Sequence, residues 1–203
     1  MSIMAKDKGG DFKQAETGTH PGRCYMILDL GHQRNEYQGE VSIRHQVLVA
    51  WEIPSQLMDD GRPVSISKFY TLSLHEKSNL GKDLVSWRGK AFTEDEKAGF
   101  DVSKLIGVPA MLSIVEHNGK SKVGSVMGMP KGMTIPDPIN DPILFDMENF
   151  INGDREVFEG LSEGLQGIIN KAQEITSPAD QRENIATLEE IPAPADFDDD
   201  IPF

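Results

Sequence analysis

A regular alternation of apolar and polar residues between positions 41 and 53 constrains the fold more than any other feature of this sequence. Successive side chains of an extended strand point to opposite faces, so a period of two predicts a strand with one buried face. The apolar face comprises Val41, Ile43, Val47, Val49, Trp51 and Ile53. Pro54 follows directly and is expected to end the strand. We therefore expect the chain to fold around a β-sheet.

Four further segments carry shorter strand patterns. The predicted strands cover residues 23–30, 64–74, 110–116 and 122–127. The first ends at Gly31, and the polar stretch 31–39 is expected to form a loop. Asn118-Gly119, between the last two strands, is a strong signal for a tight hairpin.

The spacing of apolar residues changes to that of a helix between the third and fourth strands. Apolar residues recur at i, i+4 and i+7 from Leu80 to Trp87 within the predicted helix 78–87. Thr93 and Glu96 form a capping-box pattern for a second helix that continues toward Leu105. Three strands, a helical connection and two strands are the order expected of an OB barrel, a five-stranded, partly open barrel. The predicted fold class is therefore mainly β.

Charge divides the chain into two parts. The formal net charge is −13, yet Lys and Arg number 17 against 16 Asp and Glu up to Gly132, and 3 against 17 beyond it. We expect a flexible leader over 1–20, an OB domain over 21–132 and an acidic linker over 133–195. An amphipathic segment with several glycines, about 156–175, is expected to form a helix that needs a surface to pack on. That surface is either the barrel or a second subunit, which leaves a homo-oligomer open.

Composition excludes several classes of protein. Cys24 is the only cysteine, which excludes an internal disulfide and a thiolate zinc cluster. No stretch reaches the roughly 18 uninterrupted apolar residues of a spanning helix, and the N-terminus lacks the apolar core of a signal peptide. We therefore expect a cytoplasmic protein with no membrane partner.

The motifs that would indicate catalysis are incomplete. Gly119-Lys120-Ser121 has Ile114 where the leading glycine of a phosphate loop would stand, and His75-Glu76 is not followed by a second histidine one turn later. Asp198 to Asp200 lack the glycine and the distal glutamate of a calcium loop. We therefore expect no enzyme activity, no metal and no cofactor.

The chain ends on the octapeptide Asp196-Phe197-Asp198-Asp199-Asp200-Ile201-Pro202-Phe203. It combines four aspartates, an aromatic anchor and a terminal carboxylate, which suit a basic pocket with an apolar floor. A tail that only improves solubility has no need of Ile-Pro-Phe. We interpret the octapeptide as a protein-docking motif at the end of a disordered acidic tail.

This octapeptide resembles the tail with which bacterial single-stranded-DNA-binding proteins dock helicases, nucleases and polymerase subunits. The stretches Tyr70-Thr71-Leu72-Ser73-Leu74-His75-Glu76-Lys77-Ser78-Asn79-Leu80 and Ser86-Trp87-Arg88-Gly89 resemble phage-encoded single-stranded-DNA-binding proteins of the OB type. The resemblance covers roughly residues 22–132 and the octapeptide. It implies a role in DNA replication, recombination and repair, in the host cytoplasm if the chain is phage-encoded. It assigns no individual DNA contact.

Binding of single strands without sequence preference requires aromatic rings for base stacking and cations along the phosphates. On the third predicted strand Phe69 lies on an otherwise polar face, and Lys68 and Tyr70 lie on the other. Trp51 and Trp87 fall on apolar faces and are expected in the core. The candidate DNA-binding residues are Arg34, Tyr37, Arg44, Gln46, Lys68, Phe69, Tyr70, Lys77 and Arg88.

Two other functions stay open on the sequence alone. A folded module whose only essential element is the tail would act as an adaptor or decoy of host replication proteins without binding DNA. An RNA-binding or strand-annealing accessory factor would share the same surface chemistry. Titration with single-stranded DNA, duplex DNA and RNA separates these alternatives.

Overall fold

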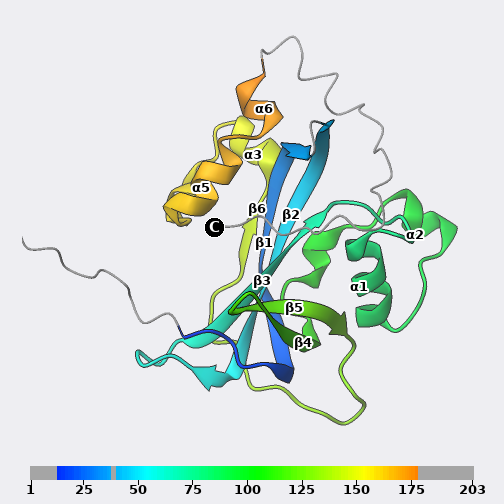
Figure 1. The fold of residues 1–203 in the computed structure, drawn as a ribbon, viewed down its shortest axis with the longest axis vertical. Coiled ribbons are helices and arrows are strands. Elements are labelled where there is room, and N and C mark those ends of the chain that lie inside the picture. Colours follow the sequence, from blue (N-terminus) through cyan, green and yellow to red (C-terminus); the bar gives the residue numbers. More distant parts are fainter. Residues whose placement is uncertain (1–12, 38–39, 178–203) are drawn as a thin grey trace, which may run out of the picture.

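The computed structural model describes residues 13–37 and 40–177, so the leader up to Phe12 and the octapeptide lie outside the described residues (Figure 1). Six strands form one sheet in the order β3-β2-β1-β4-β5, with β6 pairing parallel to β1. The other pairings are antiparallel. The strands are β1 (Gly18–Tyr37), β2 (Glu40–Leu57), β3 (Pro63–Thr71), β4 (Pro109–His117), β5 (Lys120–Met127) and β6 (Ile143–Phe145). The predicted mainly β class is confirmed.

Short helices lie on both sides of the sheet, with α1 and α2 on one side and α3, α5 and α6 on the other (Figure 1). Ser78 caps the first helix by accepting a hydrogen bond from Gly81 N, and the predicted capping box of Thr93 and Glu96 is present. The helices are α1 (Asn79–Arg88), α2 (Glu94–Ala98), the 3-10 helix η1 (Val102–Leu105), α3 (Met147–Ile151), α4 (Glu156–Gly160), α5 (Glu163–Ile169) and α6 (Gln173–Thr176). The second predicted helix therefore stops before Leu105, because Asp101 caps a separate turn.

The sheet is not closed into a barrel, because β3 and β5 share no backbone ladder in the described ranges. Side chains instead join β3 to β5 along this opening, which we call the seam. Asp83 of α1 accepts a hydrogen bond from Lys68 Nζ of β3 at 2.9 Å and one from Val126 N of β5 at 3.4 Å. Lys68 Nζ also donates to Gly124 O of β5 at 3.4 Å. The seam thus depends on a side-chain network that includes a buried carboxylate.

Both faces of the central sheet are buried. One face and α1 enclose a cluster that contains Trp51 and Trp87, with ring centroids 5.8 Å apart. Trp87 Nε1 donates to Pro109 O at 2.8 Å, which satisfies the indole while it is buried. Both tryptophans are core residues, as predicted. The opposite face contributes Leu28 and Leu48 to a second cluster, which β6 and the C-terminal helices cover.

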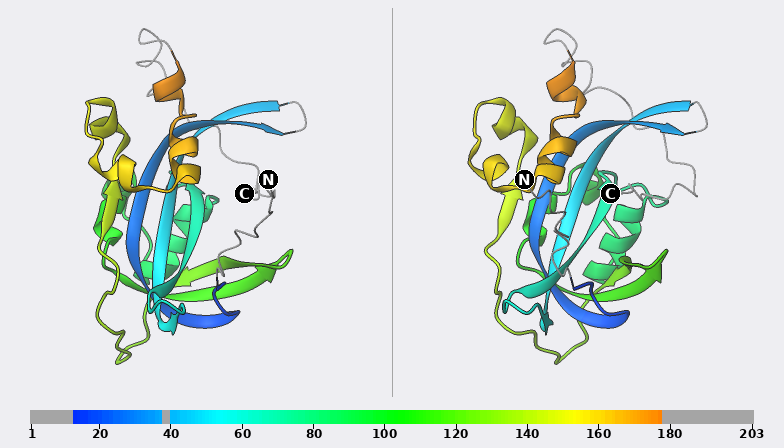
Figure 2. Two further views of the ribbon diagram at one scale, coloured as in Figure 1. Left: turned by 90° about the vertical axis from the view of Figure 1, so that its left-hand side faces the viewer. Right: turned by 60° about the vertical axis from the view of Figure 1, so that its left-hand side comes forward.

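β1 is much longer than the predicted strand 23–30 and includes most of the stretch 31–39, which corrects the prediction of a loop there. Gly31, with φ of +68°, lies at a β-bulge where the register with β2 shifts. Asp29 Oδ1 accepts a hydrogen bond from Gly31 N at 2.9 Å. Beyond the bulge β1 has polar residues on both faces, so the alternation that marks a strand disappears. We call the ribbon of residues 31–37 and 40–46 the arm (Figure 2).

Other strand ends also differ from the prediction. β2 continues past Pro54 to Leu57, and its pairing with β3 is irregular after Ile53, where a proline is tolerated. β3 ends at Thr71, before the predicted end at Leu74. The hairpin at Asn118-Gly119 is confirmed, with positive φ of 51° and 75°, as a two-residue turn requires.

Residues 133–177 belong to the folded body, which corrects the prediction of a linker there. The predicted helix over 156–175 is three helices, α4, α5 and α6, and Ser162 caps α5 after the chain turns at Leu161. These helices pack on the sheet of their own chain, so the surface they need is present without a second subunit. None of the helices in 13–37 and 40–177 is long and apolar enough to cross a membrane.

Candidate nucleic-acid interface

Lys68 and Tyr70 belong to the network at the seam and are not free to contact DNA. Tyr70 is 2% exposed, and its hydroxyl donates to Asp83 Oδ2 at 2.8 Å. Lys68 Nζ lies 2.9 Å from the same oxygen. A cation whose charge a neighbouring carboxylate already balances adds little attraction for phosphate. We therefore reassign both residues to the fold.

Phe69 lies in the second core cluster, which corrects its placement on an exposed polar face. It is 9% exposed and stands opposite Leu48 in the β2–β3 ladder. The serines on the same face of β3 are typical of a solvated surface, but the C-terminal helices cover the part of that face where Phe69 lies. Its ring is not available for stacking on a base.

Gln46 is also buried in the fold, and Arg88 is paired with other residues of the fold. Gln46 is 7% exposed at the root of the arm. Arg88 pairs with Glu96, and its Cζ lies 4.2 Å from the ring centroid of Phe92 and 5.1 Å from that of Phe100. This cation–π stack joins α1 to the segment that follows it. Both residues are therefore removed from the candidate interface.

The arm carries the remaining candidates of the first two strands. Arg34 is exposed and pairs across the ladder with Ile43, which is 38% exposed. Val41, two positions along β2 on the same face, is 49% exposed. Directly opposed residues in an antiparallel pair share a face, so a cation and two aliphatic side chains lie together.

Arg44 lies on the other face of the arm, where it pairs with Gln33. It is half-buried. Tyr37 is the last residue of β1 and pairs with Glu40 at the end of the arm. Of the predicted DNA-binding residues, the structure therefore brings Arg34, Tyr37 and Arg44 together on one projecting ribbon (Figure 2).

The loop between β3 and α1 holds Lys77 in a defined place. Ser78 Oγ donates to Ser73 O at 2.7 Å and also accepts from Gly81 N at 2.9 Å, so one hydroxyl ties the loop to the helix. A Cβ at Gly81 would lie 2.6 Å from His75 O, so only glycine fits there. Lys77 is exposed on this loop. Leu72 N, at the start of the loop, donates to His45 O of β2, which joins the loop to the root of the arm.

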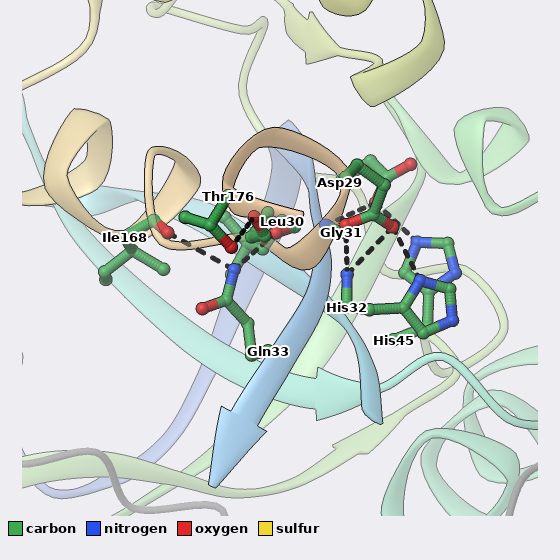
Figure 3. A network of polar contacts seen from close by, with 10 residues as sticks. Asp29, Leu30, Gly31, His32, Gln33, His45, Ile168 and Thr176 are labelled. Carbon is green, nitrogen blue, oxygen red and sulfur yellow. Dashed lines mark hydrogen bonds and ion pairs between the residues drawn. The ribbon is translucent and has the colours of Figure 1, made fainter. Parts of the chain in front are cut away.

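A polar network fixes the root of the arm to α6 (Figure 3). Glu174 accepts from His32 N at 3.0 and 2.9 Å, and its Oε1 lies 2.6 Å from His32 Nδ1. The rings of His32 and His45 lie 4.7 Å apart, and His45 Nε2 lies 2.6 Å from Asp29 Oδ1. Burial by itself raises the pKa of Glu174, but the hydrogen bond from the His32 side chain, hydrogen bonds from the backbone N–H groups of Glu174 and His32, and the charge interaction with His32 together lower that pKa. No local pattern in the sequence indicates this network, because Glu174 is 142 residues from His32.

A groove of about 310 Å³ opens beside α5 on the outer face of the sheet. Tyr25, Leu48, Ser65, Ser67 and Leu165 are among its lining residues. Burial raises the pKa of the Tyr25 phenol, and its hydrogen bond with Ser65 lowers it in part. Sequence reasoning missed Tyr25, because no local pattern brings this residue of β1 to Ser65 of β3. The described lining contains no Lys or Arg, so the groove has no attraction for a phosphate.

No protein-family model matches this chain, and a comparison with curated proteins finds no match.

Net negative charge is concentrated in one part of the described chain. From Asp146 to Ser177 there are seven acidic residues against only Arg155 and Lys171, and this layer covers the outer face of β1 to β3. A polyanion is repelled there. The arm and the loop with Lys77 lie apart from this layer in sequence and carry exposed Arg34 and Lys77 beside aliphatic side chains, together with exposed Glu36 and Glu76. A flexible polyanion with apolar bases would meet less net negative charge here than over the acidic layer.

Proposed function

We propose that this chain is a single-stranded-DNA-binding protein of the OB type. The observation that carries the proposal is the sheet order, in which β1 pairs with both β2 and β4, and helices connect β3 to β4. Such partly open five-stranded folds bind oligonucleotides through the face of the second and third strands and through the loops between strands 1 and 2 and strands 4 and 5. Here the connection between strands 1 and 2 is the arm. We propose no catalytic activity for the chain.

The interface we propose consists of the arm and the adjoining loop of residues 72–78. Arg34, Arg44 and Lys77 would follow the phosphates, while Val41 and Ile43 would contact the bases. The acidic layer on the outer face of the sheet makes the face of strands 2 and 3 unsuitable for phosphates, which leaves the loops. The stacking role expected of Tyr37, whose side chain lies outside the described ones, stays a prediction.

The octapeptide Asp196–Phe203 is proposed to dock helicases, nucleases or polymerase subunits in the cytoplasm, on the strength of its resemblance to bacterial tails. Its negative charge also makes it a competitor of DNA for the cations of the arm. The two activities are separable, because the tail and the folded body are different parts of the chain.

Fluorescence titration with labelled oligo-dT tests the proposal, with duplex DNA and RNA of equal length as competitors. We expect preference for the single strand, because stacking requires unpaired bases. Arg34→Ala and Lys77→Ala should each lower the slope of log K against log salt by about 0.7, since each removes one cation that neutralises a phosphate. Lys171→Ala is the matched control, since it removes an exposed cation from the acidic layer. No saturable signal with any nucleic acid would overturn the proposal and favour the adaptor.

A further inference from the structure

We propose that Glu174 is a positioning residue for the arm, and that through His32 it sets the DNA affinity of the cations that the arm carries. The inference rests on the proposed function. A two-stranded ribbon by itself is only marginally stable in water, so the arm needs support from the rest of the fold. In the described part of the chain, β4 pairs with β1 only at Gly18–Arg23, and β6 only at Met26–Leu28. The arm therefore lies beyond both neighbours on the β1 side.

Glu174 takes the place of the missing neighbour at the root of the arm. Its carboxylate accepts the backbone N–H of His32, at 3.0 and 2.9 Å, as a neighbouring strand would. It also lies 2.6 Å from His32 Nδ1, so backbone and side chain are held together. The side chains of His32 and Glu174 are 15% and 17% exposed, and hydrogen bonds to a charged acceptor in such a site are stronger than neutral ones.

The contact extends across both strands of the arm (Figure 3). His32 stacks on His45 with a centroid distance of 4.7 Å and an interplanar angle of 33°. His45 is fixed in turn by Asp29, which also caps the bulge at Gly31. The ring stack therefore passes the constraint from β1 to β2, the strand that carries Arg44.

A second contact, one residue further along β1, reinforces the first. Gln33 Nε2 donates to Ile168 O of α5 at 3.2 Å and to Leu30 O at 2.6 Å. A Cβ at Gly31 would lie 2.7 Å from Glu174 Oε2 and 3.0 Å from the Cβ of Ala172, so α6 approaches the bulge as closely as sterics allow. The next residue along β1 after Gln33 is Arg34. The residues that lead into this cation, His32 and Gln33, are thus held by α6 and α5.

The decisive test compares the DNA affinity of two variants that lose the same negative charge but differ in whether the lost carboxylate supports the arm. Glu174→Gln and Glu163→Gln each remove one negative charge from the same acidic layer, and Glu163 is exposed at the start of α5. On charge alone both variants should bind oligo-dT as well as the wild type or slightly better. The observed affinity is proportional to the fraction of molecules whose arm has the binding geometry. Because Glu174→Gln lowers this fraction, we expect the variant to bind oligo-dT about three- to tenfold more weakly than the wild type. Glu174→Asp, which retains the carboxylate, should restore part of the affinity.

Two further measurements separate positioning from general stability and from the proposed function. In an Arg34→Ala, Arg44→Ala background, Glu174→Gln should no longer change oligo-dT affinity, since it acts through those cations. Hydrogen exchange should be faster in Glu174→Gln for amides of the arm and unchanged in the hairpin of β4 and β5. Equal affinity of wild type and Glu174→Gln, or equal arm exchange, would overturn the inference and leave the proposed function intact. A wild-type protein that binds no DNA would overturn the proposed function and the DNA part of the inference, while exchange alone would decide whether Glu174 holds the arm.

Discussion

Replacing Phe69 by alanine should destabilise the protein strongly and leave the DNA affinity of the folded fraction unchanged. Phe69 is 9% exposed and lies in the cluster between the sheet and the C-terminal helices. Truncation of a buried phenylalanine to alanine costs about 3–5 kcal/mol, since the transfer free energy of the ring is lost and a cavity remains. Total stabilities of domains are only about 5–15 kcal/mol, so the variant should lose a large part of its free energy of unfolding.

Urea denaturation followed by tryptophan fluorescence measures this destabilisation, because Trp51 and Trp87 are buried in the other cluster and report on unfolding of the whole body. Ser67→Ala is the control on the same face of β3, and an exposed serine should change stability by no more than about 0.5 kcal/mol. Far-UV circular dichroism should follow the same transition. An unchanged midpoint for Phe69→Ala together with weaker oligo-dT binding would refute the reasoning and return Phe69 to the DNA interface.

Asp83→Ala should destabilise the fold by about 3–5 kcal/mol, because it leaves Lys68 without its carboxylate, as when one partner of a buried ion pair is removed. Chemical denaturation measures this change in the free energy of unfolding, and an unchanged midpoint would contradict the prediction. Glu174 has a lowered pKa in the folded state, so its contribution to stability is present above its ordinary pKa of 4.5 and is lost as pH falls through the folded value. The stability difference between wild type and Glu174→Gln should therefore stay constant from about pH 7 to about pH 5 and shrink below the ordinary pKa of 4.5, and a difference independent of pH would be inconsistent with this. Deletion of residues 196–203 should abolish capture of replication proteins from a bacterial lysate while DNA affinity stays equal or rises; equal capture with and without the octapeptide would show that the tail is only a solvated end.

Elements whose signals are local could be predicted from the sequence alone. The strand β2, the turn at Asn118-Gly119 and the capping box at Thr93 each depend on residues a few positions apart, and all three are present in the structure. The prediction that β2 has one buried face is wrong, because residues 47–51 are buried on both faces and Val41 and Ile43 are exposed. The mainly β class and the burial of both tryptophans follow from the same local patterns. Turn chemistry and side-chain period act within a segment, so no knowledge of the partner segment is needed.

Which surfaces are covered depends instead on tertiary packing. The serines that share a face with Phe69 and the charge of Lys68 predict that both side chains are available, but Phe69 is buried by helices that come much later in the chain, and Lys68 is paired with Asp83. The first strand of the arm is missed for the opposite reason, since residues 32–37 are polar on both faces and have no period of two to detect. Its support by Glu174 joins residues 142 positions apart. Burial and ion pairing depend on distances in space, and those distances are set by the packing of the whole chain rather than by any segment of it.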